Sequence, residues 1–92
     1  MSKRIVVIDD VPYVRKIISS ILRGAQFEVV GEGQNGKEAV ELFRKLKPDL
    51  MTMDVVMPEM SGIEATRQII KINPDARIIM ISAMSQEKLV MD

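Results

Sequence analysis

Three aspartates follow runs of apolar residues in a way that suits phosphoryl chemistry. Asp9 and Asp10 come directly after residues 5–8, and Asp54 comes directly after residues 50–53. If both runs are neighbouring parallel strands, their carboxyl ends meet at one edge of a sheet, which is where ligands bind in open α/β folds. Three carboxylates there repel one another unless a cation lies among them. Because an all-oxygen site with room for water and a phosphate suits Mg²⁺, these residues predict a magnesium site open to a phosphoryl ligand.

The chain around these aspartates alternates between strand-like and helix-like patterns. Residues 5–8 form a continuous β-branched run, which is typical of a strand buried on both faces. The next segment repeats apolar residues at helical spacing, with Pro12 in its first turn and Gly24 at its stop position. In order, the chain predicts strands over residues 5–8, 27–30, 50–53 and 78–81, and helices over residues 12–24, 35–47, 61–72 and from 86 onward.

Capping residues mark the starts of two helices. Asn35 and Ser61 each precede an apolar helical segment, and a glutamate, Glu38 or Glu64, follows three residues later, which is the spacing of a capping box. The strand over residues 27–30 has polar neighbours, which favours a place at the edge of the sheet. Strands that alternate with helices in this way predict one α/β domain over residues 1–92, with a parallel sheet and helices on both of its faces.

The composition excludes several classes of chemistry. The 92 residues include no cysteine and no histidine, which rules out disulfides, the usual zinc sites and Ser-His-Asp or Cys-His catalysis. Because 13 basic residues balance 13 acidic ones, there is no basic field to attract nucleic acid or anionic lipid. The apolar run over residues 5–8 is too short for a signal peptide or a membrane span. We therefore expect a cytoplasmic protein that binds neither nucleic acid nor membranes.

A glycine-rich segment offers a competing interpretation. Residues 31–36 read GEGQNG, which matches the G-x-G-x-x-G fingerprint of dinucleotide-binding enzymes. The strand before it is the half-polar edge candidate, however, and Glu32 would place a carboxylate in the cradle that the fingerprint reserves for pyrophosphate. We therefore interpret the segment as a flexible turn beside an edge strand, capped by Asn35.

Three blocks of the chain resemble the signature of one known family. Asp9-Asp10, residues 53–62 (MDVVMPEMSG) and residues 81–83 (ISA) stand in the order, and at the strand ends, that are typical of response-regulator receiver domains. Residues 82–86 are most similar to the chemotaxis (CheY-like) single-domain regulators. The resemblance covers nearly the whole chain. It implies a flavodoxin-like, doubly wound parallel sheet with strand order 2-1-3-4, the fifth strand and helix being absent.

The resemblance implies a role for five residues. Asp54 would accept a phosphoryl group from a histidine kinase, and Asp10 would bind Mg²⁺ directly together with Asp54. Asp9 would hold the metal through water, and the backbone carbonyl of Val56 would complete the protein ligands. The hydroxyl of Ser82 would turn toward the new phosphoryl group and act as a switch. The protein would assist its own phosphorylation without being a turnover enzyme.

The same family indicates what this chain lacks. Its fifth strand would carry a lysine that pairs with the phosphoryl group, so we expect phosphorylation and switching to be impaired in this C-terminally truncated chain. The fourth strand, residues 78–81, would become an open apolar edge. We therefore expect self-association, or an exchange of elements between two copies.

Two other functions fit parts of the pattern. A pseudo-receiver would keep the fold as a structural or interaction module without phosphorylation, and it would be indifferent to Asp54→Ala. A phosphatase-like hydrolase of similar topology would need a second acid two residues after its nucleophile, where this chain has Val56. Tyr13 and Arg15, near the start of the first helix, are interpreted as part of a solvated face rather than as a contact with a kinase.

Overall fold

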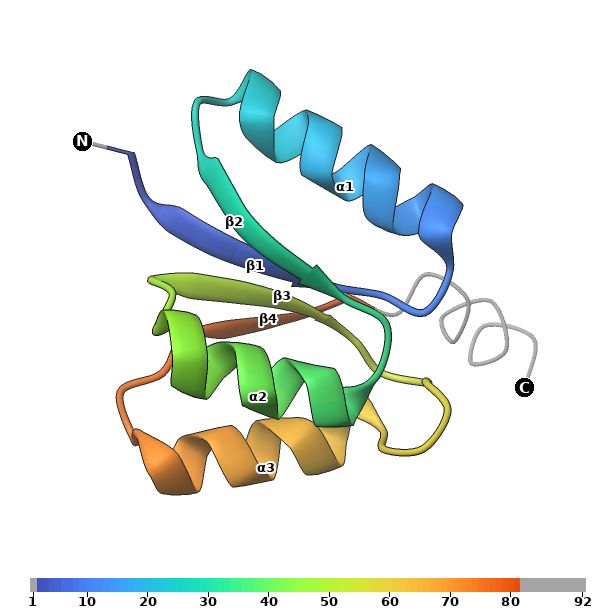
Figure 1. Cartoon of the computed structure of the whole chain (residues 1–92), viewed down its shortest axis with the longest axis vertical. Helices are drawn as coiled ribbons and strands as arrows, with labels where there is room; N and C mark the ends of the chain where they lie inside the picture. The colour runs from blue at the N-terminus through green and yellow to red at the C-terminus, as the bar shows by residue number, and fades with distance from the viewer. Residues whose placement is uncertain (1, 82–92) are drawn as a thin grey trace.

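The computed structural model describes residues 2–81 as strands and helices that alternate along the chain (Figure 1). The elements are β1 (Arg4–Ile8), α1 (Pro12–Gly24), β2 (Glu28–Gly33), α2 (Gly36–Leu46), β3 (Leu50–Asp54), α3 (Gly62–Ile72) and β4 (Ile78–Ile81). Ser82, and the helix predicted from residue 86, lie outside the described residues.

The strands form one parallel sheet in the order β2-β1-β3-β4, which confirms the predicted fold class and strand order. After β2 the chain crosses β1 to reach β3, so the direction of winding reverses between β1 and β3. Helix α1 therefore covers one face of the sheet, and α2 and α3 lie together on the other (Figure 1). The carboxyl ends of β1 and β3, the two strands on either side of the reversal, lie side by side.

The face toward α2 and α3 holds the main hydrophobic core. Side chains alternate along a strand, so Val6 and Ile8 of β1 reach this face together with Met51 and Met53 of β3, and they pack against the buried ring of Phe43 from α2. All of residues 5–8 are at most 1% exposed. The prediction of a first strand buried on both faces is therefore confirmed, and β1 is a rigid support for the residues that follow it.

The predicted caps are present at the starts of both helices on this face. Asn35 Oδ1 accepts a hydrogen bond from the Glu38 N–H at 2.9 Å, and Ser61 Oγ accepts one from the Glu64 N–H at 3.2 Å. Glu38 returns its bond one residue earlier than a capping box requires, because its Oε1 accepts from the Gln34 N–H at 2.9 Å. Since α2 and α3 run antiparallel to the strands, both capped ends lie at the carboxyl edge of the sheet.

The prediction for the second strand was wrong in its bounds. The strand covers Glu28–Gly33 instead of residues 27–30, so the first half of the glycine-rich segment is strand and not a flexible turn. A Cβ atom at Gly33 would lie 2.8 Å from the Ile8 side chain and 3.2 Å from the Glu38 Cβ. Glycine therefore eases the close packing of β2 against the Ile8 side chain and α2. This packing accounts for a glycine at position 33 without a nucleotide.

Helix α1 has the bounds that the sequence predicts, from Pro12 to Gly24. The left-handed turn that usually follows a helix falls two residues later, at Gln26, whose φ is 69°. With 13 residues α1 is the longest helix of the described part, and no helix among residues 2–81 is long and apolar enough to cross a bilayer.

Strand β4 lies at the edge of the sheet opposite β2, and it pairs with β3 over Ile78–Ile81. Within residues 2–81 no other strand pairs with it. The side chains of Ile79 and Met80 are 50% and 38% exposed. Self-association through this edge stays a prediction.

Candidate functional site

Asp9, Asp10 and Asp54 converge at the carboxyl edge of the sheet. Strands β1 and β3 are parallel neighbours with Ile8 opposite Met53, so the residues that follow them emerge side by side. One carboxylate oxygen from each aspartate lies within 4.8 Å of the others. Asp9 is only 4% exposed, and the other two aspartates are half-buried. The structure therefore brings together the three acids that the sequence pattern singles out.

This arrangement is unfavourable when all three acids are ionised. Burial raises the pKa of Asp54 from 3.8 to about 6, and a hydrogen bond with the Asp10 side chain and the negative charges of Asp9 and Asp10 add to the rise. Burial also raises the pKa of Asp9, against the opposing effect of its hydrogen bond with the Val11 N–H. The cluster therefore favours a proton or a cation among its carboxylates.

Asp9 also shapes the turn that leads into α1. Its Oδ1 accepts a hydrogen bond from the Val11 N–H at 2.9 Å, and its backbone carbonyl accepts one from Arg15 Nη1 at 2.8 Å. The Arg15 Nε lies 3.3 Å from Glu32 Oε1 in β2. The prediction of a solvated face at Arg15 was therefore wrong, because this side chain joins the ends of β1 and β2 beside the acidic cluster.

The loop over residues 55–61 connects Asp54 to α3 and folds back against the end of β3. The Gly62 N–H donates to the Val55 carbonyl at 2.9 Å. A Cβ atom at Gly62 would collide with the Asp54 carbonyl oxygen and would lie 2.9 Å from the Met53 side chain. Glycine at this position therefore allows α3 to begin directly against the backbone of Asp54.

The backbone carbonyl of Val56 accepts no hydrogen bond from the part of the chain that the structure describes. Within residues 2–81 the neighbouring carbonyls of Val55 and Pro58 accept hydrogen bonds from the N–H groups of Gly62 and Met60, whereas no donor bonds to that of Val56. Its side chain is 64% exposed, so the residue is not needed for the core. This carbonyl therefore keeps its lone pairs available, as the predicted role requires.

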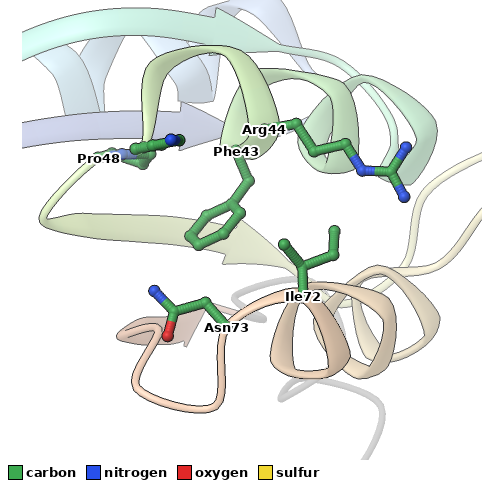
Figure 2. A pocket seen from close by; sticks show the side chains of 6 residues that line it. Phe43, Arg44, Pro48, Ile72 and Asn73 are labelled. Carbon is green, nitrogen blue, oxygen red and sulfur yellow. The ribbon is translucent and has the colours of Figure 1, made fainter.

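A cavity of about 570 Å³ lies far from these acids, between the C-terminal ends of α2 and α3 (Figure 2). Phe43 points from α2 into the gap, and Ile72 points from α3 toward α2 (Figure 2). The polar side chains that line the cavity are those of Arg44, Lys47 and Asn73. The lining includes no carboxylate and none of the clustered aspartates, so the cavity is separate from the acidic cluster.

The acidic cluster fits a hard divalent cation. Its donors are carboxylate oxygens, which suit Mg²⁺ better than softer metals, and the mutual repulsion that raises the pKa of Asp54 is relieved by positive charge. The half-burial of Asp10 and Asp54 leaves the room for water that Mg²⁺ usually retains. These features agree with the magnesium site predicted from the sequence.

Comparisons with known proteins give a consistent result. The family model described as "Response regulator receiver domain" matches residues 5–92. The chain is 48% identical to the chemotaxis protein CheY of Thermotoga maritima and 49% identical to that of Bacillus subtilis. Each match covers all of this chain and 77% of the relative.

Solved structures share the fold as well. The CheX-CheY-BeF₃-Mg²⁺ complex from Borrelia burgdorferi matches with a TM-score of 0.87 and 31% identity over 97% of this chain and 68% of that one. The response regulator TrrA from Thermotoga maritima, in complex with Mg²⁺-BeF, matches with a TM-score of 0.85 and 36% identity over 95% of this chain and 75% of that one. Through its sequence, its sheet order and the acids gathered at its strand ends, this chain belongs to the response regulator receiver domain family.

Proposed function

We propose that this protein is a phosphate-accepting signalling module of the CheY type, phosphorylated on Asp54 in the presence of Mg²⁺ and active through binding to a partner. The observation that carries the proposal is the gathering of three carboxylates from two strand ends within 4.8 Å of one another. Membership of the receiver family and the similarity to chemotaxis proteins over the whole chain support it.

Asp54 is the phospho-acceptor in this proposal, and the donor is a phosphohistidine on a histidine kinase. A carboxylate oxygen of Asp54 attacks phosphorus, the new O–P bond forms as the P–N bond breaks, and the histidine nitrogen takes up a proton from solvent. Such a transfer needs alignment and charge neutralisation more than a general acid or base. The pKa of Asp54 is raised to about 6. Positive charge nearby would therefore increase the fraction of Asp54 that is ionised, and the ionised carboxylate is the nucleophile.

The residues around Asp54 supply that compensation through a metal. Asp10 and Asp54 would bind Mg²⁺ directly, Asp9 would bind it through water, and the Val56 carbonyl would complete the protein ligands. The bound ion supplies positive charge to the oxygens of the transferred group. Asp9 and the adjacent Asp10 are held at the end of β1 by the contacts of Val11 and Arg15, so this part of the site is positioned before the ion binds.

In this proposal the protein is a substrate that assists its own modification, and it is not a turnover enzyme. We expect the protein to act in the cytoplasm, where it would meet a histidine kinase as the phosphoryl donor. The proposed function involves no binding to nucleic acid or to a membrane. The Ser82 hydroxyl keeps its predicted role as the switch that senses the phosphoryl group.

Two assays test the proposal on wild type, Asp54→Asn and Asp10→Asn. Calorimetric titration with MgCl₂ measures metal binding, and incubation with a phosphorylated histidine kinase measures phosphoryl transfer to the chain. We expect one Mg²⁺ site in wild type, weaker binding in both variants, and no phosphoryl group on Asp54→Asn. Asp75→Asn is the matched control, because Asp75 is exposed and outside the cluster. Mg²⁺ binding that is indifferent to Asp54→Ala would indicate a pseudo-receiver instead.

The same transfer assay measures the impairment expected from the sequence. The 92-residue polypeptide is compared with a version to which the fifth strand and helix of a receiver have been added. We expect slower phosphorylation of the 92-residue polypeptide. Equal rates would contradict the importance given to the lysine of the fifth strand.

Self-association through β4 is also part of the proposal, since Ile79 is 50% exposed at that edge. Sedimentation at several concentrations should show a dimer that Ile79→Lys weakens, because charged side chains on an edge strand discourage pairing. A monomer at high micromolar concentration would contradict this expectation.

A further inference from the structure

Two loops at the carboxyl edge of the sheet are joined by a buried amide. Asn35 lies between β2 and α2 and is only 6% exposed. Its Oδ1 accepts the capping hydrogen bond from the Glu38 N–H at 2.9 Å, and this bond fixes the orientation of the amide. The Nδ2 group donates to Glu59 Oε2 at 3.2 Å, across 24 residues of sequence. Both ends of one side chain are therefore used, one within its own helix and the other toward the loop that follows Asp54.

A backbone contact lies beside this amide. The Gly36 N–H donates to the Met60 carbonyl at 3.0 Å. A Cβ atom at Gly36 would lie only 2.5 Å from that oxygen and 2.7 Å from the Met60 Cγ, so the two loops are too close for any residue but glycine. The start of α2 and the loop over residues 55–61 therefore meet through two hydrogen bonds, made by consecutive residues on each side.

The backbone of Glu59 indicates that its contact with Asn35 is not incidental. Glu59 has a φ of 66°, in the left-handed region that favours glycine, asparagine or aspartate. A glutamate held in this conformation needs support from its surroundings. The Met60 N–H donates to the Pro58 carbonyl at 2.7 Å and closes a tight turn around Glu59. The hydrogen bond from Asn35 holds the side chain of the residue at the centre of that turn.

We propose that Asn35 is a positioning residue for the phosphorylation site, which it serves by holding the loop over residues 55–61 through Glu59. The inference rests on the proposed function, because this loop begins next to Asp54 and carries the Val56 carbonyl three residues before Glu59. A loop tied at its far end presents that carbonyl in one orientation. Metal ligands supported in this way by outer hydrogen bonds bind more tightly than unsupported ones.

Two substitutions that reverse the direction of the hydrogen bond between residues 35 and 59 separate the positioning role of Asn35 from its role as the N-cap of α2. Asn35→Asp keeps a good N-cap, since an aspartate also accepts from the Glu38 N–H, but it loses the donor and places two carboxylates face to face. Adding Glu59→Gln restores the bond, because the side-chain amide that this second substitution introduces donates to the carboxylate at position 35. The double variant has the same net charge as wild type. Gln34→Glu is the matched control for added charge, since Gln34 is exposed and contributes only its backbone N–H.

The first readout is hydrogen exchange without metal. The Gly36 N–H reports the contact directly, because its acceptor is the Met60 carbonyl of the other loop. We expect this amide to exchange about tenfold faster in Asn35→Asp, the effect of losing one good hydrogen bond. Exchange should return to the wild-type rate in the double variant and stay unchanged in Gln34→Glu. Equal exchange rates in wild type and Asn35→Asp would overturn the proposal.

The second readout is the dissociation constant for Mg²⁺ alone, measured by calorimetry. We expect Asn35→Asp to weaken binding about tenfold, a typical loss for a residue that supports a metal ligand, and the double variant to recover it. A double variant that binds as poorly as Asn35→Asp would overturn the positioning role. If wild type binds no Mg²⁺ while the exchange data follow the expected pattern, the proposed function fails and the loop contact stands.

Discussion

Acidic side chains have opposite surroundings at the two edges of the parallel sheet: they lie close to one another at the carboxyl edge, and one accepts a backbone hydrogen bond at the amino edge. At the carboxyl edge, Asp9, Asp10 and Asp54 present oxygens within 4.8 Å of one another, and the pKa of Asp54 is raised to about 6. At the amino edge, Asp49 Oδ2 accepts a hydrogen bond from the Arg4 N–H at 2.7 Å. An acid with a donor stabilises the folded chain, whereas an acid among acids destabilises it.

The cavity between α2 and α3 lies at the opposite edge of the sheet from the clustered acids. The cavity of about 570 Å³ lies at the amino edge and is lined by cationic Arg44 and Lys47, whereas the acids of the carboxyl edge do not line it. The candidate site is therefore marked by uncompensated negative charge and not by the volume of a cavity. The comparison predicts that steric changes act most strongly at the carboxyl edge, and that removal of an acid has opposite effects at the two edges.

The largest effect is expected from Gly62→Ala at the carboxyl edge. The added methyl group would collide with the Asp54 carbonyl, so the start of α3 must move away from the site. We expect the free energy of unfolding to fall by about 4 kcal/mol, a large loss that is typical of substitutions that cause a steric collision in a closely packed region. Chemical denaturation followed by circular dichroism measures the loss.

Gly24→Ala at the amino edge is the matched control for that variant. Nothing lies within 4 Å of a Cβ atom placed there, and the residue has no positive φ. Alanine should therefore raise the free energy of unfolding by about 0.5 kcal/mol, mainly by restricting the unfolded chain. Similar effects of the two substitutions would contradict the close approach of α3 to Asp54.

The next largest effect is expected from Phe43→Ala at the amino edge. The ring of Phe43 is 5% exposed and belongs to the core between α2 and the sheet, so its removal should lower the free energy of unfolding by about 3 kcal/mol. The Mg²⁺ dissociation constant of the folded protein should not change, because the cavity takes no part in metal binding. A weaker metal site in this variant would show that the two edges are coupled.

Local patterns were enough to predict most of the fold. The alternation of strands and helices, and the caps at Asn35 and Ser61, follow from residues within a few positions of one another. The strand order 2-1-3-4 was implied by the family resemblance instead. The bounds of β2 did not follow, since glycines that usually indicate a turn lie within the strand here, where α2 packs closely against it. The left-handed residues Gln26 and Glu59 were also not predicted. Backbone hydrogen bonds close a turn around each of them, from Phe27 N–H to the Leu22 carbonyl and from Met60 N–H to the Pro58 carbonyl, and neither residue is the glycine that usually marks such a turn.

The acids of the candidate site were predictable because strand ends of one sheet edge meet by topology alone. The groups that hold them were not. Arg15 reaches the carbonyl of Asp9 and the carboxylate of Glu32 only after β1 and β2 are in register. The contact between Asn35 and Glu59 spans 24 residues, and no spacing rule joins a helix cap to a loop that far along the chain.

Removing one acid from each edge should change stability with opposite signs. Asp54→Asn relieves the repulsion in metal-free protein. A pKa displaced from 3.8 to about 6 corresponds to about 3 kcal/mol, which solvent screening at a half-exposed site reduces to a gain of about 1–2 kcal/mol. Asp49→Asn weakens the bond to the Arg4 N–H and should cost about 0.5 kcal/mol. Urea denaturation at pH 7 without Mg²⁺ measures both, and a loss of stability in Asp54→Asn would contradict the comparison.

The stability of the metal-free protein should also depend on pH through Asp54. Its pKa is higher in the folded chain than its ordinary value of 3.8, so the folded state binds the proton more tightly than the unfolded state does. The resulting stabilisation is complete below about pH 4 and is lost as the pH rises through 6. From pH 5 to pH 7, metal-free wild type should therefore lose about 1 kcal/mol relative to Asp54→Asn, after allowance for solvent screening.

Saturating Mg²⁺ should reverse that trend, because the ion binds the ionised carboxylates and stabilises the folded state more at pH 7 than at pH 5. The measurement is urea denaturation of wild type and Asp54→Asn at both pH values, with MgCl₂ or with EDTA. The difference in the free energy of unfolding between wild type and Asp54→Asn cancels the contributions of all other acids whose titration the substitution leaves unchanged. If wild type and Asp54→Asn respond to pH alike in EDTA, Asp54 does not carry the excess negative charge that distinguishes the carboxyl edge from the amino edge.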